Sequence, residues 1–373
     1  MLLYIHIPFC KQKCHYCTFF SVPIFPELLE IYLQGLKKEI ILRAKEFNYP
    51  SISSVYVGGG TPTLLPPSVL EKIFNWLHKN FSFRECVEVT IEANPETING
   101  KNIFAVKNLG ITRVSLGVQS LNDADLKFLG RRHTAREAIS VYYMLRDAGF
   151  NNINLDFIWG LPGHTPGRWI KTLKKAIKLK PEHFSCYALT IEPGSRLARN
   201  KDKFNFPDED MLGQIYVYGA ELLNAAGYLQ YEISNFARMG YFCLHNQGYW
   251  EKQDFLGLGP SAVSTIGDRR WQNPANIKDY QQMTARKMQG LDYETLDKKK
   301  KINELIMLSL RTTRGLNLKT YRKMTGKDFL EEHARLIQLL YKNKLLKASN
   351  GHLRLTRTGM LASNTIIERF MVD

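Results

Sequence analysis

The alternation of short apolar runs with longer amphipathic stretches constrains the fold of this chain most. Six runs end in a glycine, proline or polar cluster: Leu2–Pro8, Ser54–Gly60, Val87–Pro95, Arg113–Ser120, Ile153–Pro162 and Phe184–Leu189. Stretches with helical periodicity separate them: Glu27–Phe47, Pro67–Asn80, Asn99–Leu109, Ala135–Ala148 and Gly167–Leu179. These strand-then-helix units predict an α/β fold with a parallel sheet. We expect an incomplete (β/α)6 barrel with its site at the carboxyl ends of the strands, although periodicity alone does not separate it from an open doubly wound sheet.

The pattern changes after about residue 200. A polar connector at Lys201–Asp210 leads to a predicted helix at Met211–Ala226 and a strand or loop at Tyr228–Phe236. Farther on, the chain predicts helices at Lys298–Leu310 and Leu330–Leu346, a β-hairpin wing at Gly351–Arg357 and a helix at Thr358–Phe370. Helices with a wing indicate a small winged-helix-like C-terminal domain. The expected parts are the barrel (1–200), a barrel extension (201–280) and a basic C-terminal domain (281–373).

The composition is that of a globular protein with a basic end. Hydrophobic residues make up 44% and charged residues 23%, which excludes disordered and fibrous classes. No run of about 18 apolar residues predicts a membrane span, and no signal peptide is recognised, so we expect a cytoplasmic protein. The chain has 51 Lys and Arg against 35 Asp and Glu, and residues 281–373 hold 19 of the former and 9 of the latter. The basic segment 281–373 is typical of a solvated surface, or of a surface that binds nucleic acid, an anionic membrane or an anionic partner.

Three of the six cysteines lie together in the sequence. Cys10, Cys14 and Cys17 have the spacing C-x3-C-x2-C and follow the first predicted strand. In a chain of this length, the clustering indicates metal binding in a reducing compartment rather than a disulfide scaffold. Three thiolates on one loop can hold three irons of a cubane cluster and leave the fourth iron open. A structural zinc site with His15 as its fourth ligand is the alternative.

Distinctive residues also end the other predicted strands. The second strand closes with the Gly58–Pro62 turn, where glycines let backbone groups approach a ligand closely. Glu92 ends the third strand and Gln119 the fourth, and Asp156 lies near the end of the fifth. Each residue alone is typical of a cap or a turn. Because parallel strands end at one edge, we expect these residues to converge on one pocket.

These segments resemble the radical S-adenosylmethionine (SAM) signature. Over nearly its full length, from about Leu2 to Phe370, the chain is similar to the oxygen-independent coproporphyrinogen III oxidase family. The motifs that carry this resemblance are Y-I-H-I-P-F-C at residues 4–10, the G-G-G-T-P turn, G-V-Q-S at 117–120 and the segment 156–163. The family includes true oxidases and heme chaperones.

The resemblance implies a ligand set. The cysteine triplet would hold a [4Fe-4S] cluster whose open iron binds SAM, with Tyr16 at the adenine. Contacts to this SAM are implied for Tyr4, Gly59, Glu92 and Ala188. Contacts to a second SAM are implied for Gly60, Thr61, Gln119, Arg131 and Asp156.

Three features favour the heme-chaperone branch. Phe19 stands where the oxidases have an additional cysteine, and the chain begins three residues before Tyr4, where the oxidases have a long extension. The segment 245–250 matches the H-N-x-x-Y-W motif of the chaperones, so His245 is the implied heme ligand, with Tyr249 and Trp250 beside the macrocycle. A neutral imidazole is a good axial ligand, although a structural histidine among core aromatics is the alternative. Cys243 is a lesser candidate, and the Gly257–Ser264 segment is closer to the oxidases.

The resulting hypothesis is a heme chaperone that binds a [4Fe-4S] cluster and SAM and delivers heme to acceptor haem proteins. The alternatives are an oxygen-independent coproporphyrinogen III oxidase and a radical SAM enzyme acting on nucleic acid. No base-reading motif supports the latter. Expected partners are heme or another porphyrin, a reductant such as flavodoxin or ferredoxin, a second copy of the chain and, peripherally, the inner face of the membrane. Whether the chain is an enzyme stays open at this point.

Overall fold

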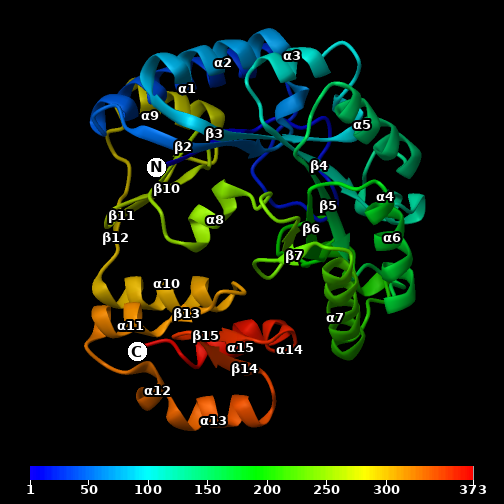
Figure 1. The fold of residues 1–373 in the computed structure, drawn as a ribbon. Helices are drawn as coiled ribbons and strands as arrows, with labels where there is room; N and C mark the ends of the chain where they lie inside the picture. Colours follow the sequence, from blue (N-terminus) through cyan, green and yellow to red (C-terminus); the bar gives the residue numbers. More distant parts are fainter. Residues whose placement is uncertain (373) are drawn as a thin grey trace.

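The computed structural model describes residues 1–372, without the side chains of Glu85 and Cys86. Within this range the main sheet has 12 strands in the order β12-β11-β10-β9-β1-β2-β3-β4-β5-β6-β8-β7. Its centre consists of six parallel strands: β1 (Leu2–Ile7), β2 (Ser51–Gly59), β3 (Ser82–Ala93), β4 (Arg113–Gln119), β5 (Ile153–Trp159) and β6 (His183–Ala188). The predicted parallel α/β sheet with its six strand-then-helix units is therefore confirmed, and the sheet curves into an incomplete barrel (Figure 1).

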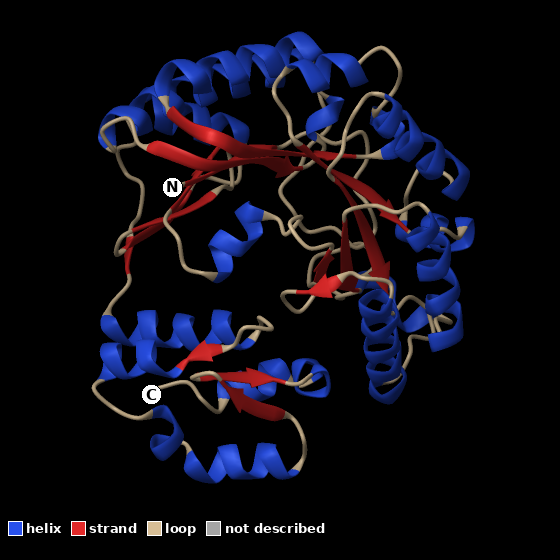
Figure 2. Cartoon of the chain, in the orientation of Figure 1, coloured by secondary structure: helices blue, strands red, loops and turns tan. Residues whose placement is uncertain are grey.

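The crossover helices cover the outer face of this sheet (Figure 2). They are α1 (Pro26–Glu46), α2 (Pro67–Asn80), α3 (Ile103–Asn108), α4 (Asp123–Leu129), α5 (Ala135–Asp147) and α6 (Pro166–Lys178). Local signals set their limits: Thr134 and Glu137 form a capping box at the start of α5. The sequence pattern did not predict α4, which has seven residues between the Asn122 cap and Gly130 in the left-handed region.

Both edges of the parallel sheet are extended by later parts of the chain. Helix α7 (Glu209–Ala225) packs on α6, and the predicted return at 228–236 forms β7 (Leu229–Gln230) and β8 (Asn235–Ala237), antiparallel to β6. At the other edge β9 (Phe255–Leu258) lies parallel to β1. It is followed by β10 (Val263–Ile266), β11 (Arg269–Gln272), α9 (Ile277–Ala285) and β12 (Glu294–Thr295).

Helix α8 (Leu244–Trp250) carries the H-N-x-x-Y-W motif and lies between the main sheet and α10 (Lys298–Leu310) (Figure 1). The Glu88 carboxylate, on β3, accepts hydrogen bonds from the backbone N–H groups of Leu244 and His245, at 3.1 and 3.2 Å. Beyond the other end of the helix, Lys252 Nζ donates to the carbonyl of Lys301 at 2.8 Å. Both ends of α8 are therefore held by distant parts of the chain.

The C-terminal region forms a second body around a three-stranded sheet, in the order β13-β15-β14. Its elements are α10 (Lys298–Leu310), β13 (Leu316–Asn317), α11 (Leu318–Thr325), α12 (Phe329–Glu332), α13 (Ala334–Lys342), β14 (Leu346–Ser349), β15 (His352–Leu355), α14 (Arg357–Leu361) and α15 (Ser363–Glu368). The wing starts earlier than predicted, because Gly351 lies in the turn of the β14–β15 hairpin with φ of 73°. The two flanking predicted helices are each split in two. Among the helices of residues 1–372, none has the length and apolar character of a membrane span.

Candidate functional site

The cysteine loop begins where β1 ends. It is closed by hydrogen bonds from Cys10 N–H to the Val22 carbonyl and from Val22 N–H to the Pro8 carbonyl, at 3.0 and 2.8 Å. Burial raises the pKa of the Cys10 and Cys17 thiols, and Cys14 adds to both shifts, so the three sulfur atoms interact. Burial and mutual repulsion disfavour the thiolate forms of these cysteines. A cationic group bound between them would therefore stabilise the thiolates.

The described side chains do not form a converged site for a single metal ion. With the side chains of Glu85 and Cys86 left aside, no three His, Cys, Asp or Glu side chains form a group close enough to hold one metal ion. A zinc site requires such convergence, whereas each cysteine of a [4Fe-4S] cluster binds its own iron. The His15 Nδ1 donates to the carbonyl of Phe128 at 2.8 Å. This bond ties the loop to the C-terminal end of α4.

Arg131 connects the cysteine loop to the strand ends. Its guanidinium donates to Cys14 Sγ at 3.5 Å, to the Gly117 carbonyl at 3.0 Å and to Asn94 Oδ1. Asn94 Nδ2 donates in turn to Thr61 Oγ1, which lies 3.6 Å from Cys10 Sγ. Arg131 Nε is buried without a partner among the described residues. The structure thus brings together the predicted residues Arg131 and Thr61 beside two of the cysteines.

The glycine turn after β2 holds Glu92. Gly59 has φ of 107°, and its N–H donates to the Glu92 carboxylate at 3.1 Å. A Cβ on Gly60 would lie 2.6 Å from the Phe9 carbonyl oxygen, so only glycine fits there. The Tyr56 hydroxyl donates to Glu92 at 2.9 Å. Burial, reinforced by Asp156, raises the pKa of Glu92 to about 7, which leaves the carboxyl ready to ionise beside a cation.

The other predicted SAM contacts lie on neighbouring strands. Gln119 ends β4 with φ of 63°, a sparsely populated conformation for a residue other than glycine. Asp156 accepts hydrogen bonds from Ser115 and Asn154, at 2.8 and 2.7 Å. Ala188 is exposed at the end of β6. The carboxyl ends of these parallel strands lie at one edge of the sheet, and the meeting of all these residues in one pocket stays a prediction.

The two predicted SAM-site tyrosines differ in their surroundings. Tyr4, on β1, lines a cavity inside the barrel, and its hydroxyl lies 3.1 Å from His6 Nδ1. Tyr16 packs beside the small apolar cluster of Leu129, Ile158 and Leu161. Burial raises the pKa of Tyr16, although Arg131 acts in the opposite direction.

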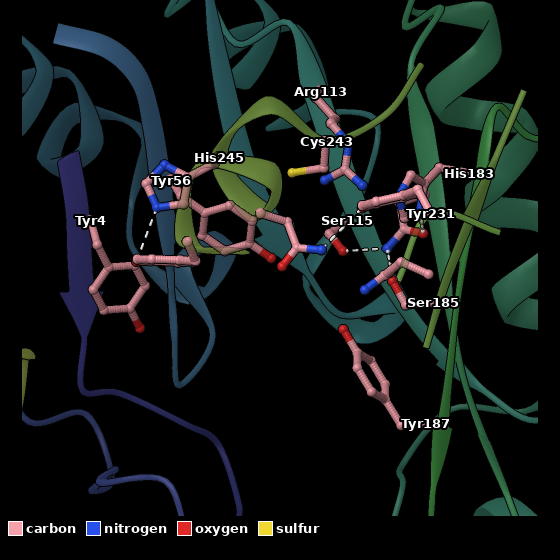
Figure 3. Close-up of a pocket in the computed structure, with 14 residues that line it drawn as sticks. Tyr4, Tyr56, Arg113, Ser115, His183, Ser185, Tyr187, Tyr231, Cys243 and His245 are labelled. Atoms are coloured by element: carbon pink, nitrogen blue, oxygen red, sulfur yellow. Dashed lines mark hydrogen bonds between the residues drawn. The ribbon is translucent and has the colours of Figure 1, made fainter. Parts of the chain in front are cut away.

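His245 faces the same cavity from α8 (Figure 3). The residue is 1% exposed. Its Nδ1 lies 2.8 Å from Ser54 Oγ, and its Nε2 lies 3.1 Å from the Tyr249 hydroxyl. Burial, together with Arg113, lowers the pKa of His245 to about 3, so the imidazole is neutral at physiological pH. Neutral imidazole is the form that binds metals.

Trp250 and the lesser candidate Cys243 have different surroundings from those of His245. Trp250 does not line the cavity described here, and its Nε1 is buried without a partner among the described residues. Cys243 lines the cavity, but its thiol donates to the Glu88 carboxylate at 3.4 Å. Burial raises the pKa of Cys243 to about 12, despite the opposing effect of Arg113. Cys243 is therefore a neutral thiol.

A polar network on the cavity wall was not predicted. Asn154 Nδ2 donates to Ser115 Oγ at 2.7 Å and to Ser185 Oγ at 2.9 Å. Asn154 Oδ1 lies 2.6 Å from His183 Nδ1, and His183 Nε2 lies 2.9 Å from the Tyr231 hydroxyl. Residues of β4, β5 and β6 are thereby joined across the barrel interior. The cavity that they line has a volume of about 190 Å³.

Comparisons with known proteins agree with this geometry. The Radical SAM superfamily model matches residues 4–176, and the HemN C-terminal domain model matches residues 296–362. Heme chaperone HemW of Bacillus subtilis is 31% identical over 99% of this chain and 98% of its own length. HemW of Haemophilus influenzae is 39% identical over 70% of this chain and 69% of its own. The structure of coproporphyrinogen III oxidase (HemN) from Escherichia coli superposes with a TM-score of 0.85 and 26% identity, covering 100% of this chain and 90% of that one. The chain therefore belongs to the HemW family of the radical SAM superfamily.

Proposed function

We propose that this protein is a heme chaperone of the HemW type, and that heme binds at the α8 end of the barrel cavity. The observation that carries this proposal is the state of His245. If Nδ1–H donates to Ser54 Oγ, Nε2 keeps the lone pair that a metal requires and turns it towards the cavity. The Tyr249 hydroxyl donates a hydrogen bond to that lone pair when no iron is bound, and iron would displace this hydroxyl.

Membership of the radical SAM superfamily implies a [4Fe-4S] cluster and SAM as cofactors. The residues of this chain fit both groups. Cys10, Cys14 and Cys17 would hold the cluster, which supplies electrons for reductive chemistry on SAM when both are bound. Glu92, whose pKa lies near neutrality, would accept the SAM ammonium group, and the Gly59 turn leaves room for it. Arg131 and Gln119 would line the site of a second SAM molecule.

An anaerobic titration tests the heme proposal. Reconstituted protein is mixed with heme, and both the heme Soret band and the cluster absorption are followed in the same sample. We expect His245→Ala to weaken heme binding by at least tenfold and to leave the cluster spectrum unchanged, because His245 does not contact the cysteine loop. Unchanged heme affinity would remove His245 from the ligand role.

An oxidase activity is the second candidate, because the fold resembles that of HemN over the whole chain. The oxidase-like Gly257–Ser264 segment has a packing reason of its own: a Cβ on Gly259 would lie 2.6 Å from the His6 carbonyl oxygen. The segment therefore does not decide between the branches. Anaerobic incubation with coproporphyrinogen III, SAM and a reductant distinguishes them, since formation of protoporphyrinogen would contradict a purely chaperone role.

The finer partners follow from the same proposal. Acceptor haem proteins would take up the heme, and a flavodoxin or ferredoxin would reduce the cluster. Docking at an anionic membrane surface is the role that we assign to the basic C-terminal domain, because clustered Lys and Arg are attracted to anionic lipid. A pull-down with vesicles that contain or lack anionic lipid tests this docking.

A further inference from the structure

Arg113 lines the barrel cavity, and its guanidinium Nε has no hydrogen-bonding partner among the described residues. The residue is 2% exposed, and its side chain points from β4 towards Cys243 and the network around Ser115 (Figure 3). Among the side chains that the structure describes, which leave out those of Glu85 and Cys86, Arg113 forms no hydrogen bond and no ion pair, and its Nε is buried without a partner. An arginine has five N–H donors, and leaving such a buried charge unpaired is costly.

Three carboxylates interact electrostatically with Arg113, and each of them already accepts hydrogen bonds from other groups. Glu88 holds the N-terminus of α8, Glu92 accepts from Tyr56 and the glycine turn, and Asp156 accepts from Ser115 and Asn154. Each influences or is influenced by Arg113 only at longer range. None of the described carboxylates therefore occupies the donors of Arg113, which can bind a group that enters the cavity.

The other groups around Arg113 are neutral. Burial lowers the pKa of His183 and of His245, and Arg113 contributes to both shifts. Ser185 and Asn154 add hydrogen-bonding groups on the same wall. A planar guanidinium among neutral polar groups matches a carboxylate, which it binds through two parallel hydrogen bonds.

We propose that Arg113 anchors a carboxylate of the ligand that enters this cavity, and that this carboxylate is a propionate of heme. The choice of heme rests on the proposed function, because His245 lies on the same cavity wall as Arg113. The cavity volume of about 190 Å³ is below the range of about 300–1,000 Å³ typical of drug-sized ligands, so the cavity must widen at α8 for the porphyrin ring to reach His245 while its propionate reaches Arg113.

A comparison of two ligands and three proteins tests the proposal. Heme and heme dimethyl ester, in which both propionates are esterified, are titrated into the wild type, Arg113→Met and Arg113→Lys. We expect the wild type to bind the ester at least tenfold more weakly than heme, because a hydrogen-bonded charge pair is lost. Arg113→Met should bind both ligands with equal, reduced affinity, and Arg113→Lys should be intermediate. Arg146→Met is the matched control, since Arg146 pairs with Glu182 on the helical side of the sheet and should leave the ratio unchanged.

Several results would overturn the proposal. Equal binding of heme and ester by the wild type would exclude carboxylate recognition, while leaving His245 and the chaperone function in place. A preference for heme that persists in Arg113→Met would assign the propionate to another residue. A loss of SAM affinity in Arg113→Met without a change for heme would assign the anchored carboxylate to SAM. Failure of the wild type to bind either porphyrin would refute the proposed function itself.

Thermal unfolding without ligand separates an anchor from a structural role. An anchor is an unpaired buried charge before the ligand binds, so Arg113→Met should leave the melting temperature unchanged or raise it. A marked fall, together with an unchanged ratio of heme to ester affinity, would identify Arg113 as a structural partner of Glu88 and contradict the proposal.

Discussion

Removal of the Tyr249 hydroxyl and removal of the Ser54 hydroxyl, the two hydrogen-bonding partners of the His245 ring, should have opposite effects on heme affinity. Tyr249 bonds to Nε2, the nitrogen that iron would occupy, whereas Ser54 bonds to Nδ1 on the far side of the ring. Tyr249→Phe removes the hydroxyl and keeps the aromatic ring. The hydrogen bond that iron must displace contributes about 1 kcal/mol, so its removal should strengthen heme binding about fivefold.

Ser54→Ala should have the reverse effect. The Ser54 hydroxyl is buried and orients the ring, and loss of such a support for a metal ligand typically weakens metal binding by about 10- to 100-fold. The assay is equilibrium titration with heme, followed by the Soret band. Melting temperatures of the three proteins check that they are folded. Weaker binding by Tyr249→Phe, or equal affinities for all three proteins, would refute the assignment of Nε2 as the iron ligand.

The remaining predictions concern SAM, helix packing and nucleic acid. SAM affinity should fall about tenfold per pH unit below pH 7 and be constant above it, because the pKa of Glu92 is about 7 and only the ionised carboxylate favours the SAM cation. In a binding titration from about pH 5.5 to 8.5, Glu92→Gln should abolish this slope. On helix α7, Gly219→Ala should destabilise by about 1–3 kcal/mol, since the new Cβ would lie 2.3 Å from Trp169 Nε1. Gly213→Ala on the same helix, with Leu361 at 3.5 Å, should instead stabilise by about 0.5–1 kcal/mol in urea unfolding. If the nucleic-acid alternative held, RNA retention would fall steeply with salt concentration; we expect none at moderate salt.

The long strand-then-helix units could be predicted because their periods are strong and their ends carry local signals. The seven-residue helices α4 and α8 could not. Helix α8 depends on the Glu88 carboxylate, which lies 156 residues from Leu244 in the chain. The contact between Ser54 and His245 spans 191 residues. No local pattern encodes such contacts, so the sequence identified His245 as a candidate without its surroundings.

The missed cavity residues left a signal in the sequence. Strands β4, β5 and β6 carry polar residues at alternate positions: Arg113 and Ser115, Asn154 and Asp156, His183 and Ser185. Side chains at alternate positions of a strand point to the same face. Three neighbouring strands with this pattern indicate a polar barrel interior. Which of the polar groups lacks a partner is a matter of tertiary geometry and could not be predicted.

The attachment of α8 at both ends couples two distant parts of the molecule. Its first turn is held by Glu88 on the barrel, and the residue that follows its last turn, Glu251, forms an ion pair with Arg314 in the C-terminal region, at 3.6 Å. A ligand that shifts the helix as a rigid body must strain both attachments. Under thermodynamic linkage, a partner docked on the C-terminal domain would then change heme affinity by the same factor by which heme changes the affinity for that partner. If this coupling weakens binding, contact with an acceptor would favour the release of heme.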